Sequence, residues 1–171
     1  MTTFLWSKSP STTRRLLAIV LGTIVTITAH SAVSTVTVAT CKEPSGYSYY
    51  HEGGMLSKKD SGFTEDKITG GLFTLVRIGQ KEYDLLFVDA SKSITSTKQE
   101  GGRIQLLRRG RNDATFLVVY PNSTELFTFY KENNSGSERF DMLQSKGGAM
   151  PIHKSTVMTG SCSGLRFNFL D

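Results

Sequence analysis

Two cysteines have the widest range of possible chemistry in this chain. Cys162 lies in the string Gly160-Ser161-Cys162-Ser163-Gly164, which has the G-x-C-x-G form of a nucleophile elbow. That motif needs a strand before it, a helix after it and a histidine further along the chain, but only seven residues follow Gly164 and none is histidine. We therefore expect Cys162 to form a disulfide with Cys41, with the nearby glycines in a turn or bulge. Free thiols, or a disulfide between two chains, are the alternatives.

Catalytic and metal-binding motifs of regular spacing are missing from the sequence. It has no HExxH, no pair of CxxC motifs, no EF-hand loop and no phosphate-binding glycine loop. Asp60, Glu65 and Asp66 are close together, but they lack the alternating oxygen ligands of a calcium loop, and neighbouring lysines balance their charge. We expect no metal, no cofactor and no catalytic residue. A hydrolase with a carboxylate pair that the sequence does not reveal is the alternative.

Four arginines form the densest basic group of the chain: Arg103, Arg108, Arg109 and Arg111. Three of them lie at or beside one predicted hairpin tip, where they could bind phosphate, sulfate or an acidic glycan through charge-assisted hydrogen bonds. No aromatic residues are interleaved with them, so a nucleic-acid groove with stacking platforms is not expected. The alternative is a solvated hairpin end whose charge keeps an edge strand from aggregating.

A second candidate surface is the aromatic group Tyr47, Tyr49, Tyr50 and His51. Because side chains alternate along a strand, we expect Tyr47 and Tyr49 to share one face and Tyr50 to point to the other face with Ser48. Exposed aromatic faces suit sugars and protein partners. The alternative is that these rings belong to the core and that only their hydroxyl groups reach the surface.

The first 39 residues have the order of a signal peptide and its cleavage region. Met1–Arg15 is basic and contains no acid, and Leu16–Ala29 is an apolar run of 14 residues followed by small and polar ones. A helix of that length spans about 21 Å, less than a hydrocarbon core of about 30 Å. An uncleaved anchor that reaches Val38 is the alternative. Small residues mark two possible cleavage positions, after Ser31 and after Ala39.

Export would set both the compartment and the charge of the working protein. We expect a secreted or periplasmic location, where disulfides persist. The whole chain has 20 basic and 15 acidic residues and a net charge of +5. Loss of Lys8, Arg14 and Arg15 with the signal would leave 17 basic against 15 acidic residues, a net charge of +2. Because nucleic-acid-binding domains are clearly basic, nucleic acid is not an expected partner.

Downstream of the signal the sequence is typical of an all-β protein, with short strand-like runs between turn residues. The runs predicted as strands are Tyr47–His51, Leu72–Ile78, Tyr83–Ala90, Arg103–Arg109, Ala114–Tyr120, Thr124–Lys131, Arg139–Ser145, His153–Thr159 and Leu165–Leu170. Successive hairpins indicate antiparallel pairing. Residues 40–171 are therefore predicted to form one antiparallel domain of eight or nine strands, either a β-barrel or a β-sandwich.

One polar segment, Glu52–Gly71, does not fit the pattern of strands. It is twenty residues long and rich in glycine and charge. Long connections without regular structure are often functional, so this segment is a candidate functional loop. The alternatives are a short helix over Thr64–Ile68 or a strand with a poor hydrophobic pattern.

No motif identifies a family. The plan of a signal peptide, a strand-rich body and one disulfide between the two ends resembles that of small periplasmic lysozyme inhibitors. Ser45-Gly46-x-x-Tyr49 is similar to their Ser-Gly loop. Because only three residues match, we infer no function from this resemblance.

These features together predict an exported, non-enzymatic binding or envelope-associated protein. Its expected partner is a protein, or an acidic glycan or lipid, of the cell envelope. An inhibitor or capture protein that acts on an enzyme or a glycan is an alternative. The mature chain is not expected to cross a membrane.

Overall fold

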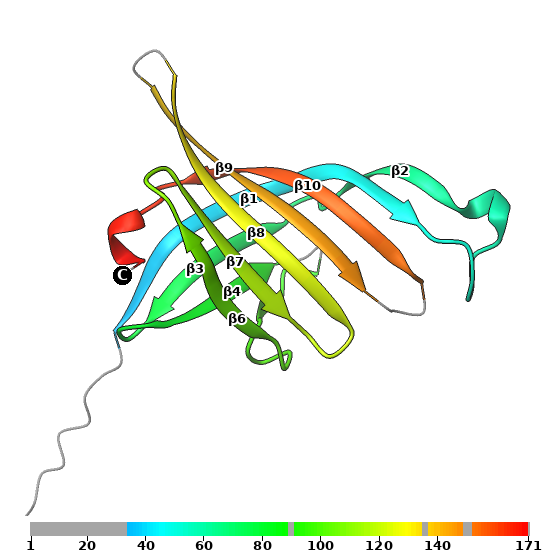
Figure 1. Ribbon diagram of the computed structural model, residues 1–171, viewed down its shortest axis with the longest axis horizontal. Coiled ribbons are helices and arrows are strands. Elements are labelled where there is room, and N and C mark those ends of the chain that lie inside the picture. The colour runs from blue at the N-terminus through cyan, green and yellow to red at the C-terminus, as the bar shows by residue number, and fades with distance from the viewer. Residues whose placement is uncertain (1–33, 89–90, 135–136, 149–151, 171) are drawn as a thin grey trace, which may run out of the picture. The chain divides into compact units, whose positions relative to one another are not determined.

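The computed structural model in Figure 1 describes residues 34–88, 91–134, 137–148 and 152–170. The chain divides after Ser31 into Met1–Ser31 and Ala32–Asp171, and the fold described below belongs to the second unit. Residues 1–33 of the predicted signal peptide and cleavage region lie outside the described residues. Among the residues that are described, no helix combines the length and the apolar character needed to cross a membrane.

A single antiparallel sheet makes up most of the described chain, which confirms the predicted all-β class. Its strands are β1 (Thr35–Tyr50), β2 (Gly62–Lys67), β3 (Leu72–Ile78), β4 (Glu82–Val88), β5 (Ile94–Ser96), β6 (Arg103–Arg109), β7 (Asp113–Val119), β8 (Ser123–Asn134), β9 (Ser137–Gly148) and β10 (Lys154–Ser163). Two short 3₁₀ helices accompany them, η1 (Lys58–Asp60) and η2 (Phe167–Phe169). The sheet has ten strands, so the predicted number of eight or nine is too low.

Strand β1 is the centre of the sheet, whose order is β5-β4-β3-β1-β10-β9-β8-β7-β6. One edge of β1 pairs with β10, while its other edge pairs first with β3 and then, from Ser45 onwards, with β2. The change of partner follows Glu43, whose φ is 50°, and the buried Pro44. Proline has no N–H to donate to a strand ladder. The pairing of β1 with β3 therefore ends here, and β2 pairs with the same edge of β1 from Ser45 onwards.

The sheet curls so that its two ends pack against each other across the core (Figure 1). The rings of Tyr83 on β4 and Phe116 on β7 lie 5.1 Å apart, and those of Phe73 on β3 and Phe127 on β8 lie 5.8 Å apart. The predicted architecture was a β-barrel or a β-sandwich. Within the described strands no ladder joins the two edges, so the sheet is not closed into a barrel, and the strands form one sheet that curls over itself rather than two separate sheets. A hollow of about 310 Å³ lies between β4 and β6 and is lined by the buried Leu170.

Two predicted segments have a different structure from the one expected. Leu165–Leu170 is not a strand, because Gly164 adopts a φ of +65° directly after β10 and the chain then forms η2. Leu165 and Leu170, which flank η2, are both in the core, and Phe167 and Phe169 pack against it. The predicted loop Glu52–Gly71 contains η1 and β2, so the alternative of a strand with a poor pattern holds for Gly62–Lys67.

The predicted disulfide between Cys41 and Cys162 is present. The two residues face each other directly in the β1–β10 ladder. Cys41 has no exposed surface. The bond therefore joins two neighbouring central strands whose cysteines are 121 residues apart in sequence.

Candidate functional site

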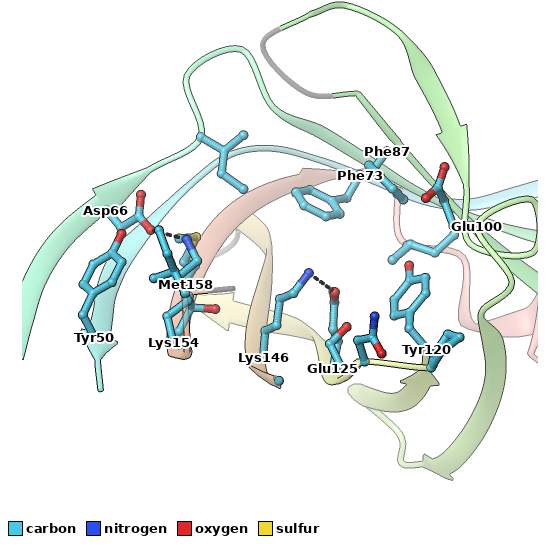
Figure 2. A pocket seen from close by; sticks show the side chains of 18 residues that line it. Tyr50, Asp66, Phe73, Phe87, Glu100, Tyr120, Glu125, Lys146, Lys154 and Met158 are labelled. Carbon is cyan, nitrogen blue, oxygen red and sulfur yellow. Dashed lines mark hydrogen bonds and ion pairs between the residues drawn. The ribbon is translucent and has the colours of Figure 1, made fainter. Parts of the chain in front are cut away.

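The inner face of the sheet contains a cleft of about 870 Å³, shown in Figure 2. Side chains from strands on both sides of the curl line it, together with the turn between β7 and β8. The lining residues are Tyr50, Asp66, Ile68, Phe73, Leu85, Phe87, Glu100, Tyr120, Pro121, Asn122, Ser123, Glu125, Lys146, Gly148, Ile152, Lys154, Thr156 and Met158. The cleft is thus built from residues between positions 50 and 158 that only the fold brings together.

One side of the cleft is apolar. Phe73 on β3 and Phe87 on β4 are opposite each other in the ladder, and their rings stack with centroids 6.5 Å apart. Leu85 lies on the same face of β4 two residues before Phe87, and Ile68 follows the end of β2. This side is formed by inward-facing residues that do not fill the space in front of them.

The other side of the cleft carries a row of polar residues across four strands. Ser48 on β1 pairs with Thr156 on β10, Thr156 pairs with Lys146 on β9, and Lys146 pairs with Glu125 on β8. Lys154 lies two residues before Thr156 and therefore shares its face. Antiparallel register alone places these side chains next to one another.

Two ion pairs lie along this polar row, and Figure 2 draws both. The Lys146 ammonium is 2.6 Å from a Glu125 carboxylate oxygen, and the Lys154 ammonium is 3.4 Å from Asp66. The Glu125 side chain is only 7% exposed, whereas the side chains of Lys146 and Lys154 are 39% and 40% exposed. A buried carboxylate is costly without a partner, so Lys146 compensates Glu125 while keeping part of its own surface open.

Asp66 is held in its ionised form. The Ser48 hydroxyl donates a 2.6 Å hydrogen bond to its carboxylate. This bond, with the nearby Lys154 ammonium, lowers the pKa of Asp66 below its ordinary value although burial acts in the opposite direction. A glycosidase general acid needs a raised pKa. Asp66 therefore lacks the property that the hydrolase alternative requires of an acid in this cleft.

Tyr120 borders the cleft near Glu125. Its hydroxyl is 3.1 Å from the Thr97 hydroxyl, and the Lys146 ammonium lies 6.0 Å from the centre of its ring. Burial raises the pKa of Tyr120, so the phenol stays neutral at physiological pH. It gives this end of the cleft an aromatic edge and a hydroxyl without adding charge.

The predicted aromatic group is divided between the two faces of the sheet. Tyr50 lines the cleft, with the Lys154 ammonium 5.7 Å from the centre of its ring. Tyr47 and Tyr49 are on the opposite face and are 55% and 37% exposed. The Tyr49 ring lies 4.8 Å from that of His51 and 4.9 Å from that of Phe63 on β2. We call Tyr47, Tyr49, His51 and Phe63 the outer aromatic group.

The four predicted arginines are on or beside the edge strand β6 and do not line the cleft. Arg103 begins this strand and Arg109 ends it, a span of about 20 Å. Arg108 forms an ion pair with Asp113 across the hairpin, and Arg111 is exposed in the turn. Arg108, Arg109 and Arg111 therefore share one hairpin end, while Arg103 is separated from them.

Sequence reasoning missed Glu125, Lys146 and Lys154. A usable signal was present for Glu125, which has the same alternation as Phe127 and Phe129 and therefore lies on the inner face with them. Lys154 is four residues before the buried Met158 on the same strand and therefore also lies on the inner face. A charged residue that alternates with buried apolar residues faces the interior of the sheet. Such a residue indicates either an ion pair that neutralises its charge or a binding site.

No family model, curated protein or solved structure matches the chain. The residues similar to the Ser-Gly loop of lysozyme inhibitors, Ser45 to Tyr49, lie inside β1 and pair with strands on both sides. They do not form a loop here. The cleft and the sequence are therefore the basis for the functional argument.

Proposed function

We propose that the protein is an exported, non-enzymatic binding protein that holds a small molecule with an apolar body in the cleft. The observation that carries this proposal is the cleft of about 870 Å³ with an apolar side and a few placed polar groups. Small-molecule sites have volumes of about 300–1,000 Å³ and this same composition. The half-buried Phe87 and Ile68 on the apolar side keep part of their surface accessible. Water in contact with them would be released when an apolar ligand enters, which favours binding.

Export is supported by the sequence and by the disulfide. The basic, apolar and small-residue order of the first 39 residues matches a secretory signal. The Cys41–Cys162 bond is of the kind that persists in oxidising compartments. A secreted or periplasmic binding protein is the proposal that joins these features to the cleft.

A second candidate function uses the outer aromatic group. Tyr47 and Phe63 are 55% and 78% exposed and lie on adjacent strands. Aromatic rings at this level of exposure suit capture of an enzyme or a glycan. The Y47A/F63A double variant separates the two functions, because it should abolish capture of an envelope partner while leaving binding in the cleft unchanged.

The main proposal is tested with N-phenyl-1-naphthylamine, a neutral apolar fluorophore, added to the exported protein. We expect saturable binding with one site and a strong rise in fluorescence. Met158→Trp places a bulky ring in the cleft and should abolish this binding, because Met158 is a lining residue.

The matched control is Val157→Trp, which places the same ring one residue away on the outer face, where Val157 is 53% exposed. It should bind the fluorophore as the unmodified protein does. Thermal unfolding shows whether both variants are folded. Failure of the unmodified protein to bind, or equal binding by the folded M158W and V157W variants, would overturn the proposal.

A further inference from the structure

We infer that the cleft selects an amphipathic anion, a molecule with one negatively charged head group and an apolar tail. The head group would lie at the ammonium groups of Lys146 and Lys154, and the tail would lie against Phe73 and Phe87. This inference rests on the proposed function and adds the chemical class of the ligand.

The two lysines are placed to act on one head group. In the β9–β10 ladder Lys146 pairs with Thr156 and Lys154 pairs with Gly148, so the lysines are diagonal neighbours on one face with backbones about 7–8 Å apart. Figure 2 shows both side chains between their carboxylate partners, with Asp66 beyond Lys154 and Glu125 beyond Lys146. Gly148 adds no side chain to the space beside them.

Each ammonium group retains hydrogen-bonding capacity. A lysine ammonium has three N–H donors. The ion pair with Glu125 uses one donor of Lys146, and the ion pair with Asp66 uses one donor of Lys154. About two-fifths of each lysine side chain is exposed, and both lysines line the cleft. The remaining donors can therefore form charge-assisted hydrogen bonds with an anionic head group.

The carboxylates of the polar row are less accessible than the lysines. Glu125 is 7% exposed and contacts Lys146, while Asp66 accepts hydrogen bonds from Ser48 and Lys154. The exposed Glu100 also lines the cleft, near Tyr120 in Figure 2. Its charge repels an anion from that end, so the head group is directed towards Lys154 and away from Glu100.

The apolar and polar residues lie on different walls, which is the reason for an amphipathic ligand. Phe73, Leu85 and Phe87 come from β3 and β4, whereas the lysines come from β9 and β10. Figure 2 shows the two phenylalanines across the cleft from Lys146. A ligand that fills the cleft must meet both surfaces. A charged head group without a tail would leave the accessible part of the apolar wall, at Phe87, in contact with water.

The test compares three probes of equal chain length at pH 7: dodecanoate, 1-dodecanol and dodecylammonium. Each is used below its micelle concentration to displace N-phenyl-1-naphthylamine from the exported protein. We expect dodecanoate to bind at least about tenfold more tightly than the other two, the effect of one or two hydrogen bonds to a charged group. Raising the salt concentration should weaken dodecanoate alone.

Lysine variants show whether the preference comes from the named residues. Lys154→Met and Lys146→Met should each reduce dodecanoate affinity about tenfold and leave 1-dodecanol affinity unchanged. Lys98→Met is the control, because Lys98 has a similar exposure and pairs with Glu82 at 2.8 Å but does not line the cleft. If K146M does not fold, K154M and the charge-reversing K154E give the same information.

The outcomes separate this inference from the proposed function. Equal binding of dodecanoate and 1-dodecanol, tighter binding of dodecylammonium, or unchanged dodecanoate affinity in folded K154M would overturn the anion inference while the cleft stays a binding site. Failure of the neutral fluorophore and of all three probes to bind would overturn both.

Discussion

The Ser48 hydroxyl donates a 2.6 Å hydrogen bond to the Asp66 carboxylate and so connects the central strand β1 with the edge strand β2 at one end of the cleft. Ser48 has no exposed surface. Its backbone partner in β2 is Thr64, and Asp66 is the diagonal neighbour. The bond therefore fixes the orientation of the only cleft carboxylate from β2 and keeps it next to Lys154.

The first prediction concerns Ser48→Ala, which should raise the pKa of Asp66 towards its ordinary value because the largest lowering contribution is removed. In the unmodified protein the folded-state pKa is depressed. Stabilisation by ionised Asp66 is therefore fully present above the unfolded-state pKa and is lost as the pH falls through the folded-state value. S48A should lose less stability on acidification below about pH 4.

NMR titration of the Asp66 carboxyl group, together with urea unfolding at several pH values, measures both effects. Ser45→Ala is the matched control, because Ser45 is an exposed serine on the same strand. An Asp66 pKa that is equal in S48A and in the unmodified protein would show that Ser48 does not hold the carboxylate in its charged form.

The second prediction concerns the ion pair between the buried Glu125 and the partly exposed Lys146. Lys146→Met should lower the free energy of unfolding by about 2 kcal/mol, because the Glu125 carboxylate loses a charged partner while it stays buried. The double variant E125L/K146M should recover most of that loss, since it removes both charges. Lys98→Met breaks an exposed pair and should leave the urea midpoint unchanged. A double variant no more stable than K146M would contradict the argument.

The third prediction concerns the disulfide. The C41A/C162A double variant should be less stable by roughly 3 kcal/mol, because the bond closes a long loop in the unfolded chain. Urea unfolding of the variant, and of the unmodified protein with and without a thiol reductant, measures this loss. The reductant should shift the midpoint of the unmodified protein only. Equal midpoints for all samples would show that the bond adds no stability.

The fourth prediction concerns processing. Of the two cleavage positions predicted from sequence, the one after Ser31 leaves β1 whole, whereas cleavage after Ala39 would remove the buried Val38 and Ala39 from the core. We therefore expect the exported protein to begin at Ala32, the first residue of the second unit. Intact mass spectrometry gives the N-terminus. A chain that begins at Thr40, or a full-length chain in the membrane fraction, would contradict this prediction.

Alternating apolar residues and turn residues were enough to predict the all-β class and several strands. Leu72–Ile78 and Arg103–Arg109 have the same bounds in the sequence prediction and in β3 and β6. Strand β2 was predicted only as an alternative to a functional loop, because it is an edge strand of mostly exposed polar residues. Backbone pairing with β1 stabilises it, and backbone hydrogen bonds leave no hydrophobic pattern in the side chains.

Composition and local spacing were enough to predict the strand-rich class and the pairing of the two cysteines, because the first depends on neighbouring residues and the second had only one possible partner within the chain. The secretory signal was predicted from the same kind of local pattern and stays a prediction. The cleft depends instead on ladder register and sheet curvature, which bring Asp66, Glu125, Lys146 and Lys154 together from four strands. Asp66 and Lys146, taken in their own segments, are indistinguishable from solvated charges. The alternation around Glu125 and Lys154 places these two residues on the inner face but does not show what they contact there. Contacts over such sequence distances arise only when the whole sheet folds and curls around its core.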